Sequence, residues 1–142
     1  MIHLKFNSES ENEAIARVVT AAYIMRFDPD MEEMEDVKTA VSEAVTNCIV
    51  HAYEDKDGEI QMDLSDTDGI LKIMIKDQGI GILDVKKAME PMFTTKPDQE
   101  RTGMGFSFME AFMDHVEVIS TPGEGTSVIM TKKMGEAKRF HG

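Results

Sequence analysis

Hydrophobic side chains follow two different periods along the chain, and the two periods predict different backbone conformations. In some segments apolar residues recur every three or four positions, which is typical of a helix with one apolar face. In others they alternate with polar residues, which is typical of a strand with one buried face. On this basis we expect strands at 2–6, 60–64, 71–75, 116–121 and 126–132, and helices at 15–25, 31–53, 84–90 and 103–115.

The order of these elements predicts the fold class. Ser8 with Glu11, or Ser10 with Glu13, could form a capping box before the first helix. The segment 66–69, Asp-Thr-Asp-Gly, joins two alternating runs and predicts a β-hairpin. Consecutive hairpins and clustered helices favour an α/β fold, a two-layer sandwich of a mixed, largely antiparallel sheet with helices on one face.

Composition and charge narrow the choice of partners. The 142 residues are 42% hydrophobic and 30% charged, so a folded domain is expected and disorder is not. The net charge of −12 argues against direct binding of nucleic acid or of an anionic membrane, because a phosphate-rich surface would repel the chain. We expect a single domain over residues 1–134 and a flexible tail over 135–142.

Cysteine usage and the first residues favour a cytoplasmic protein. The single cysteine, Cys48, cannot form an internal disulfide, which is most simply explained by a reducing compartment. The opening residues lack the continuous apolar run of a signal peptide, and the longest apolar-rich run, 18–25, is too short to span a bilayer.

Three polar residues on the second helix form the first candidate site. Glu43, Asn47 and His51 are four positions apart, so they make one polar row along that helix. The row lies beside the apolar stripe and could face a cleft, although an ordinary solvated face would show the same spacing.

A second candidate lies where a strand ends. Asp77 has the same parity as the apolar residues of its strand, so it points to the buried face, where a carboxylate needs a partner. Gly79 and Gly81 would let the backbone approach another group closely, although a turn with a capping Asp explains the same residues.

The last helix begins with a third candidate. Its first residues, Gly103, Met104, Gly105 and Phe106, would present backbone N–H groups and the positive end of the helix dipole to a phosphate. The preceding polar loop contributes Lys96 and Arg101, which could fold over a triphosphate or simply be solvated. The spacing is not that of a P-loop.

Taken together, these motifs resemble the GHKL ATPase superfamily, which includes DNA gyrase B, Hsp90, MutL and the catalytic domains of sensor histidine kinases. Glu43-x-x-x-Asn47 matches the N box of that superfamily. Asp77-x-Gly79-x-Gly81 and Gly103-x-Gly105 match its two glycine boxes. Over almost the whole chain, the segments at 42–47, 91–97 and 101–106 further resemble the anti-sigma F factors of endospore-forming bacteria.

That resemblance implies an ATP-dependent serine protein kinase that sequesters a sporulation sigma factor and phosphorylates its anti-anti-sigma antagonist. It also implies ATP or ADP as nucleotide, Mg²⁺ and a homodimer. Two other functions stay open: a nucleotide-gated protein-binding module without kinase turnover, and a histidine-kinase-type catalytic domain.

The resemblance also assigns roles to individual residues. Glu43 would orient or deprotonate the attacking hydroxyl, Asn47 would coordinate Mg²⁺, and Asp77 would accept a hydrogen bond from adenine with Thr126 as its neighbour. The nucleotide-binding set is completed by His51, Gly79, Gly81, Lys96, Arg101, Gly103, Met104, Gly105 and Phe106.

Overall fold

The computed structural model describes residues 1–90 and 105–135. Strands and helices follow one another in the expected order. The elements are β1 (Ile2–Asn7), α1 (Glu11–Ile24), the 3-10 turn η1 (Met25–Phe27), α2 (Met31–Asn47), the π-helical turn η2 (Cys48–Ala52), β2 (Glu59–Thr67), β3 (Ile70–Asp77), α3 (Val85–Ala88), α4 (Gly105–Phe112), β4 (His115–Thr121) and β5 (Gly125–Lys133).

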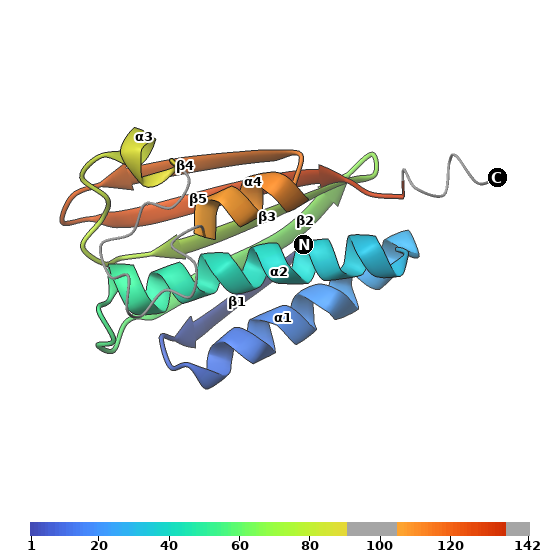
Figure 1. Ribbon diagram of the computed structural model, residues 1–142. Helices are drawn as coiled ribbons and strands as arrows, with labels where there is room; N and C mark the ends of the chain where they lie inside the picture. The colour runs from blue at the N-terminus through green and yellow to red at the C-terminus, as the bar shows by residue number, and fades with distance from the viewer. Residues whose placement is uncertain (91–104, 136–142) are drawn as a thin grey trace.

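The five strands form one sheet in the order β1-β2-β3-β5-β4. Every described strand pair is antiparallel, including β3 with β5, where Ile73 is opposite Met130. Figure 1 shows the long helices α1 and α2 and the shorter α4 on the same side of the sheet. The predicted two-layer α/β sandwich is therefore confirmed.

The core lies between the sheet and α2. Every second residue of β2 and β3 points toward the helices, and the apolar stripe of α2 packs on them. The fully buried side chains of this layer include Val37, Val41, Ala44, Val45, Ile60, Met62, Leu64, Leu71, Ile73 and Ile75. Because burial of apolar area is the main stabilising term in folding, this contact fixes α2 on the sheet.

The β2–β3 hairpin is confirmed with a tighter turn than the sequence suggested. Thr67 pairs with Ile70, so only Asp68 and Gly69 form the connection. Both have positive φ, 52° and 80°, as a two-residue hairpin turn that follows the strand twist requires.

Both capping boxes predicted before α1 are wrong. Ser10 is the N-cap but makes no side-chain capping bond, while the Oγ of Ser8 accepts from Gly58 N and donates to the carbonyl of Lys56. Ser8 is therefore recruited by a contact distant in sequence, which local pattern cannot foresee. The capping box belongs to α2 instead, where Asp30 Oδ1 accepts from Glu33 N at 2.8 Å and Glu33 accepts in return from the backbone of Asp30.

The helix at α1 exists, but most of the apolar residues that predicted it face outward. Ile15, Val18 and Met25 are 55%, 67% and 59% exposed. The side that packs into the domain carries Ala16, Thr20, Tyr23 and Ile24. The reason is tertiary. α1 packs against both α2 and the sheet, and this packing decides which face of the helix is buried.

The second predicted helix changes its winding before it ends. Ordinary α-helical structure stops at Asn47, and η2 continues it as a π-helical turn in which Tyr53 N donates to the carbonyl of Cys48. The described part of the last helix ends at Phe112, short of His115, which is the first residue of β4. Within residues 1–90 and 105–135, no helix is long and apolar enough to cross a membrane.

Candidate nucleotide-binding site

A cavity of about 530 Å³ opens at the end of the sheet where β3 stops and β5 starts. Its walls come from α2, η2, the β3–α3 connection, α3, the start of α4 and β5. The lining residues are Ala44, Asn47, Cys48, His51, Ala52, Asp77, Ile80, Gly81, Ile82, Leu83, Asp84, Lys87, Ala88, Glu90, Gly105, Phe106, Ser107, Thr126 and Val128. A mainly apolar cavity with a few convergent polar groups is the usual form of a small-molecule site.

Asp77 is the buried charge of this cavity. It is the last residue of β3 and only 4% exposed, because it points to the helical side as its parity in the strand predicts. Its Oδ1 accepts from Gly79 N at 2.9 Å and from Thr126 N at 3.2 Å. The carboxylate is thus fixed by two backbone N–H groups, one from the following turn and one from β5.

Burial and hydrogen bonding act in opposite directions on this carboxyl group. Burial raises the pKa of Asp77, while hydrogen bonds from the backbone of Gly79, the thiol of Cys48 and the backbone of Thr126 lower it and leave a net increase. The pKa of Cys48 is raised well above its usual range, first by burial and then by the charge of Asp77. Cys48 is therefore a neutral donor beside Asp77.

Glycines in this region are required by contacts inside the protein. A Cβ on Gly79 would lie 2.3 Å from the carbonyl oxygen of Ala52, and one on Gly81, whose φ is +77°, would lie 2.4 Å from that of Thr121. The close approach expected for these glycines is therefore to η2 and to the β4–β5 turn. Gly81 also lines the cavity, whereas Gly79 orients Asp77 through its N–H.

The π-helical turn is what brings α2 to this glycine segment. The carbonyl oxygen of Ala52 accepts from Ile80 N at 3.0 Å, so the last residue of η2 holds the backbone just after Asp77. On the same turn, Cys48 and His51 line the cavity together with Asn47 at the end of α2. Two members of the predicted polar row, Asn47 and His51, therefore lie in the same cavity as Asp77.

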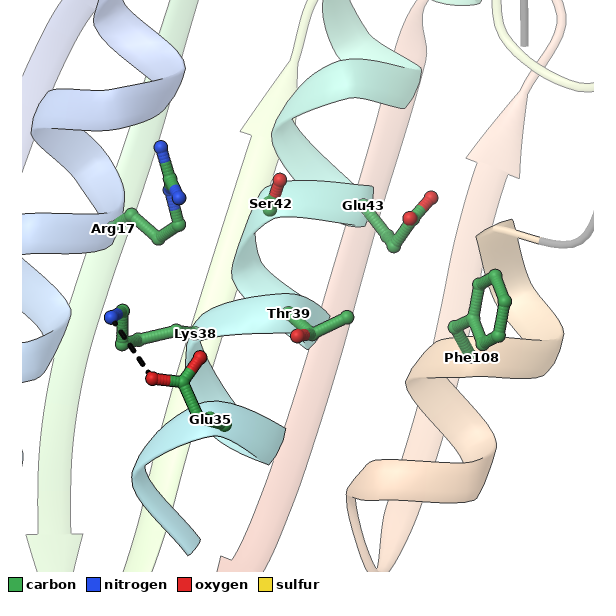
Figure 2. Close-up of a pocket in the computed structure, with 7 residues that line it drawn as sticks. All are labelled: Arg17, Glu35, Lys38, Thr39, Ser42, Glu43 and Phe108. Atoms are coloured by element: carbon green, nitrogen blue, oxygen red, sulfur yellow. Dashed lines mark hydrogen bonds and ion pairs between the residues drawn. The ribbon is translucent and has the colours of Figure 1, made fainter. Parts of the chain in front are cut away.

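The third member of the row, Glu43, lines a different cavity. This neighbouring hollow of about 290 Å³ lies between α1, α2 and α4 and is lined by Arg17, Glu35, Lys38, Thr39, Ser42, Glu43 and Phe108. Figure 2 shows Glu43 projecting from α2 on the side of Phe108, whereas Arg17 and Lys38 lie toward α1. Glu43 and Asn47 are one helical turn apart, about 6 Å along the axis. Ala44, the residue after Glu43, already lines the larger cavity, so the two cavities adjoin along α2.

The start of α4 supplies the remaining wall. Gly105 is buried, and it lines the cavity together with Phe106 and Ser107, so the amino-terminal end of α4 is directed at this space. The positive end of a helix dipole favours an anion there. The predicted site residues Lys96, Arg101, Gly103 and Met104, and with them the polar loop that could fold over a triphosphate, lie outside the described residues.

Several residues of the site were not singled out from the sequence. Ser120 Oγ accepts from Ile82 N at 2.7 Å and lies 2.8 Å from Thr126 Oγ1, so it joins the glycine segment to β5. Ser120 lies on the same face of β4 as Val116 and Val118, and this alternation is the sequence signal that could have identified it. The hydroxyl of Tyr53 accepts from Gln78 N at 2.7 Å, a contact between distant segments that no sequence pattern announces.

Comparison with known proteins agrees with this geometry. Residues 6–132 match the family described as histidine kinase-like ATPase domain. Among solved structures, the catalytic domain of the histidine kinase ThkA has a TM-score of 0.59 at 18% identity and covers 94% of this chain and 97% of its own. A Mycobacterium tuberculosis protein with RsbU and RsbW domains has a TM-score of 0.63 at 15% identity, covering 94% of this chain and 33% of its own. At such identities these two show the fold alone, and the fold and site define an ATPase domain of the histidine kinase-like class.

Sequence relatives narrow the class further. The anti-sigma F factor of Caldanaerobacter subterraneus subsp. tengcongensis is 56% identical, covering 95% of this chain and 94% of its own. That of Bacillus subtilis is 45% identical and covers 96% and 94%. The chain belongs to the anti-sigma F factor family.

Proposed function

We propose that the chain binds ATP in the larger cavity, transfers the γ-phosphoryl group to a serine of an anti-anti-sigma protein, and sequesters a sporulation sigma factor. The observation that carries the proposal is the buried carboxylate of Asp77, fixed by two backbone N–H groups in a cavity that also contains Asn47. A buried, oriented acceptor of this kind suits a donor such as the amino group of adenine.

The base would enter beside Asp77 and lie among apolar side chains. Ile80, Leu83, Ala88 and Val128 line that space, and the aromatic face of a purine suits such walls. Thr126 would support the base edge, because its backbone N–H already orients Asp77 and its hydroxyl lies within hydrogen-bond distance of Ser120.

The phosphates would extend toward Asn47 and the start of α4. Among the described residues, no group of three or more His, Cys, Asp or Glu could hold a metal ion on its own. The donor set instead fits Mg²⁺, which takes few protein ligands beside phosphate oxygens and water, so the amide oxygen of Asn47 would hold it. When bound, Mg²⁺ would neutralise phosphate charge, while the first N–H groups of α4 would bind phosphate oxygens.

Glu43 would act from the neighbouring cavity. Its carboxylate is one helical turn from Asn47, so a serine hydroxyl that enters the cavity of Figure 2 would meet Glu43 before it meets the phosphates. Glu43 would accept the proton of that hydroxyl or orient it for in-line attack.

The partners follow from the family. The relatives carry the name anti-sigma F factor, which names a sigma factor as the protein they oppose. We infer that this chain binds a sigma factor and an anti-anti-sigma protein, and that it does so as a homodimer.

One observation favours a second candidate, a nucleotide-gated binding module without kinase turnover. Glu43 does not line the cavity that holds Asn47 and Asp77, as a base acting directly at the phosphates would. In that case the nucleotide would control partner binding without being consumed.

Radiolabelled ATP and a purified anti-anti-sigma protein separate the candidates. Label that moves to the partner and survives acid shows phosphoserine transfer, whereas acid-labile label would indicate phosphohistidine. Retained nucleotide binding with no label on the partner would overturn the kinase proposal and favour the binding module.

A further inference from the structure

The hydroxyl of Tyr53 lies where the β2–β3 ladder would otherwise continue. The last paired residues of the two strands at this end are Ile60 and Asp77. The next pair along the ladder would be Glu59 and Gln78. The Tyr53 hydroxyl instead accepts from Gln78 N at 2.7 Å and donates to the carbonyl oxygen of Glu59 at 2.5 Å. One side-chain oxygen therefore bridges the two backbones where β3 ends.

The strand register shows that this bridge replaces a direct ladder bond. Thr67 and Ile70 flank the two-residue turn, and the residues of such a closing pair exchange backbone hydrogen bonds. Along an antiparallel ladder, hydrogen-bonded pairs alternate with pairs that are not hydrogen-bonded. Glu59 and Gln78 lie an even number of positions from the closing pair, so in a continued ladder Gln78 N would donate directly to the carbonyl of Glu59. The inserted hydroxyl keeps these two groups apart.

Neighbouring segments hold the Tyr53 ring in this position. Tyr53 follows η2 directly, and its own N–H donates to the carbonyl of Cys48. Its ring lies against Gly58, where an added Cβ would come within 2.3 Å of the ring carbon Cε1. Ser8 fixes Gly58 in turn: its N–H donates to the glycine carbonyl at 2.8 Å, and its Oγ accepts from the glycine N–H at 2.9 Å. Burial raises the pKa of Tyr53, so the hydroxyl keeps the proton that it donates.

The bridge sets the path of the backbone that orients Asp77. Gly79 N donates to Asp77 Oδ1 at 2.9 Å. The residue before Gly79 is held by the Tyr53 hydroxyl, and the residue after it is held by the carbonyl oxygen of Ala52. Closing the ladder by one more pair would draw Gln78 toward β2 and carry the N–H of Gly79 away from the carboxylate. The position of the Tyr53 hydroxyl therefore controls one of the two backbone bonds that fix Asp77.

We propose that Tyr53 is a positioning residue for nucleotide recognition: its hydroxyl, inserted between β2 and β3, holds Asp77 in the orientation that accepts the amino group of adenine. This inference rests on the adenine contact included in the proposed function and assigns the residue that prepares it. Tyr53 is not among the described residues that line the larger cavity, so it acts through Asp77 and not on the nucleotide itself. An acceptor held in place before binding loses less freedom when the ligand arrives.

The first test compares the two tyrosines of the chain. Tyr53→Phe removes the inserted hydroxyl and keeps the ring. Tyr23→Phe is the matched control, because the Tyr23 hydroxyl also joins distant segments, by donating to Asp66 at 2.5 Å, but at the hairpin end of β2. Fluorescent ATP is displaced from each protein with ATP and with GTP, since guanine has a carbonyl oxygen where adenine has its amino group. Tyr53→Phe should bind ATP about tenfold more weakly and lose about tenfold in its preference for ATP over GTP, whereas Tyr23→Phe should change neither.

The second test needs no nucleotide. Amide hydrogen exchange followed by NMR reports on the N–H of Gly79, which is protected by its bond to Asp77. In Tyr53→Phe this amide should exchange about tenfold faster than in the unmodified protein, because the segment after β3 is no longer held. In Tyr23→Phe it should change no more than the other amides of β3 do, which corrects for any general loss of stability.

The outcomes separate this inference from the proposed function. An unchanged exchange rate of Gly79 in Tyr53→Phe would overturn the positioning role, and so would equal effects in the two tyrosine variants, which would leave the hydroxyl with a contribution to stability alone. Faster exchange with an unchanged preference for ATP would overturn the role in recognition. An unmodified protein that does not prefer ATP to GTP would overturn the adenine contact of the proposed function and the recognition role with it, while the exchange rate of Gly79 would still decide whether Tyr53 orients Asp77.

Discussion

The two cavities that adjoin along α2 differ in how their polar groups are stabilised. The larger one holds the carboxylate of Asp77, which is almost fully buried and fixed by backbone N–H groups from two separate segments. The smaller one holds polar side chains that are partly solvated, such as Lys38, which pairs with Glu35 at 3.4 Å. Removing a hydrogen-bond partner from a buried charge lowers the free energy of unfolding strongly, whereas an exposed ion pair contributes only roughly 0–1 kcal/mol to it.

This difference indicates that the two cavities along α2 bind different kinds of molecule. A preorganised, desolvated site suits a ligand of fixed shape, because its groups need not reorganise on binding. A solvated hollow between helices suits a protein segment that must enter and leave. We therefore expect changes in the larger cavity to affect folding and nucleotide binding together, and changes in the smaller one to affect transfer to the partner.

The largest effect should come from the backbone contact beneath the larger cavity. Gly125 has φ +118°, and a Cβ there would lie 2.2 Å from the carbonyl oxygen of Asp77. Gly125→Ala should lower the free energy of unfolding by about 3 kcal/mol, through steric overlap and backbone strain together. Urea unfolding measures it. Gly123, with φ +80° and nothing near its Cβ, is the control: Gly123→Ala should cost about 1 kcal/mol, and equal losses would remove the role given to close packing.

The second-largest effect should distinguish Glu43 from Asn47, which lie one helical turn apart on α2. Glu43→Ala should keep ATP affinity within about tenfold yet slow phosphoryl transfer by about 10²-fold or more, the usual scale for a general base. Asn47→Ala should instead remove the Mg²⁺-dependent part of ATP binding. Titration of fluorescent ATP with and without Mg²⁺, beside a transfer assay, distinguishes them. The same phenotype in both variants would mean that the two cavities work as one.

A third prediction uses the raised pKa of Asp77. The carboxylate is the acceptor, so ATP affinity should fall as the pH decreases through that raised pKa. Stability should change in the opposite sense: because the pKa is higher in the folded protein, ionisation of Asp77 costs stability as the pH rises through it. Asp77→Asn should bind adenine nucleotides about tenfold more weakly and lose both pH dependences. A pH profile unchanged by the substitution would remove Asp77 from the site.

The smallest effect belongs to the smaller cavity. Lys38→Ala removes the pair with Glu35, and both side chains are partly exposed. The free energy of unfolding should change by no more than about 0.5 kcal/mol. A loss above about 2 kcal/mol in urea unfolding would show that this cavity is as tightly built as its neighbour.

Much of the site could be predicted because it depends on local pattern. The parity of Asp77 in its strand placed it on the buried face, and the spacing of Asn47 and His51 placed them on one side of α2; both agree with the structure. Thr126 lies beside Asp77 as the family resemblance implied. The chemical roles of these residues stay predictions.

Other features depend on contacts between segments distant in sequence. Glu43 shares the spacing of Asn47 but lines another cavity, because α4 and α1 pack on either side of that turn of α2. Ser120 and Tyr53 join the site through hydrogen bonds to backbone that lies 38 and 25 residues away in the chain.

The sequence by itself determined the strands, the hairpin, the buried stripe of α2 and the family motifs, because period and turn chemistry are local properties of the chain. Only the tertiary structure decided which face of α1 is buried. Ile15, Val18 and Met25 have the spacing of a core face, yet they point away from the domain, because α2 and the sheet together accept the side of Ala16 and Thr20. Periodicity shows that a helix has an apolar face, but only packing shows what that face contacts.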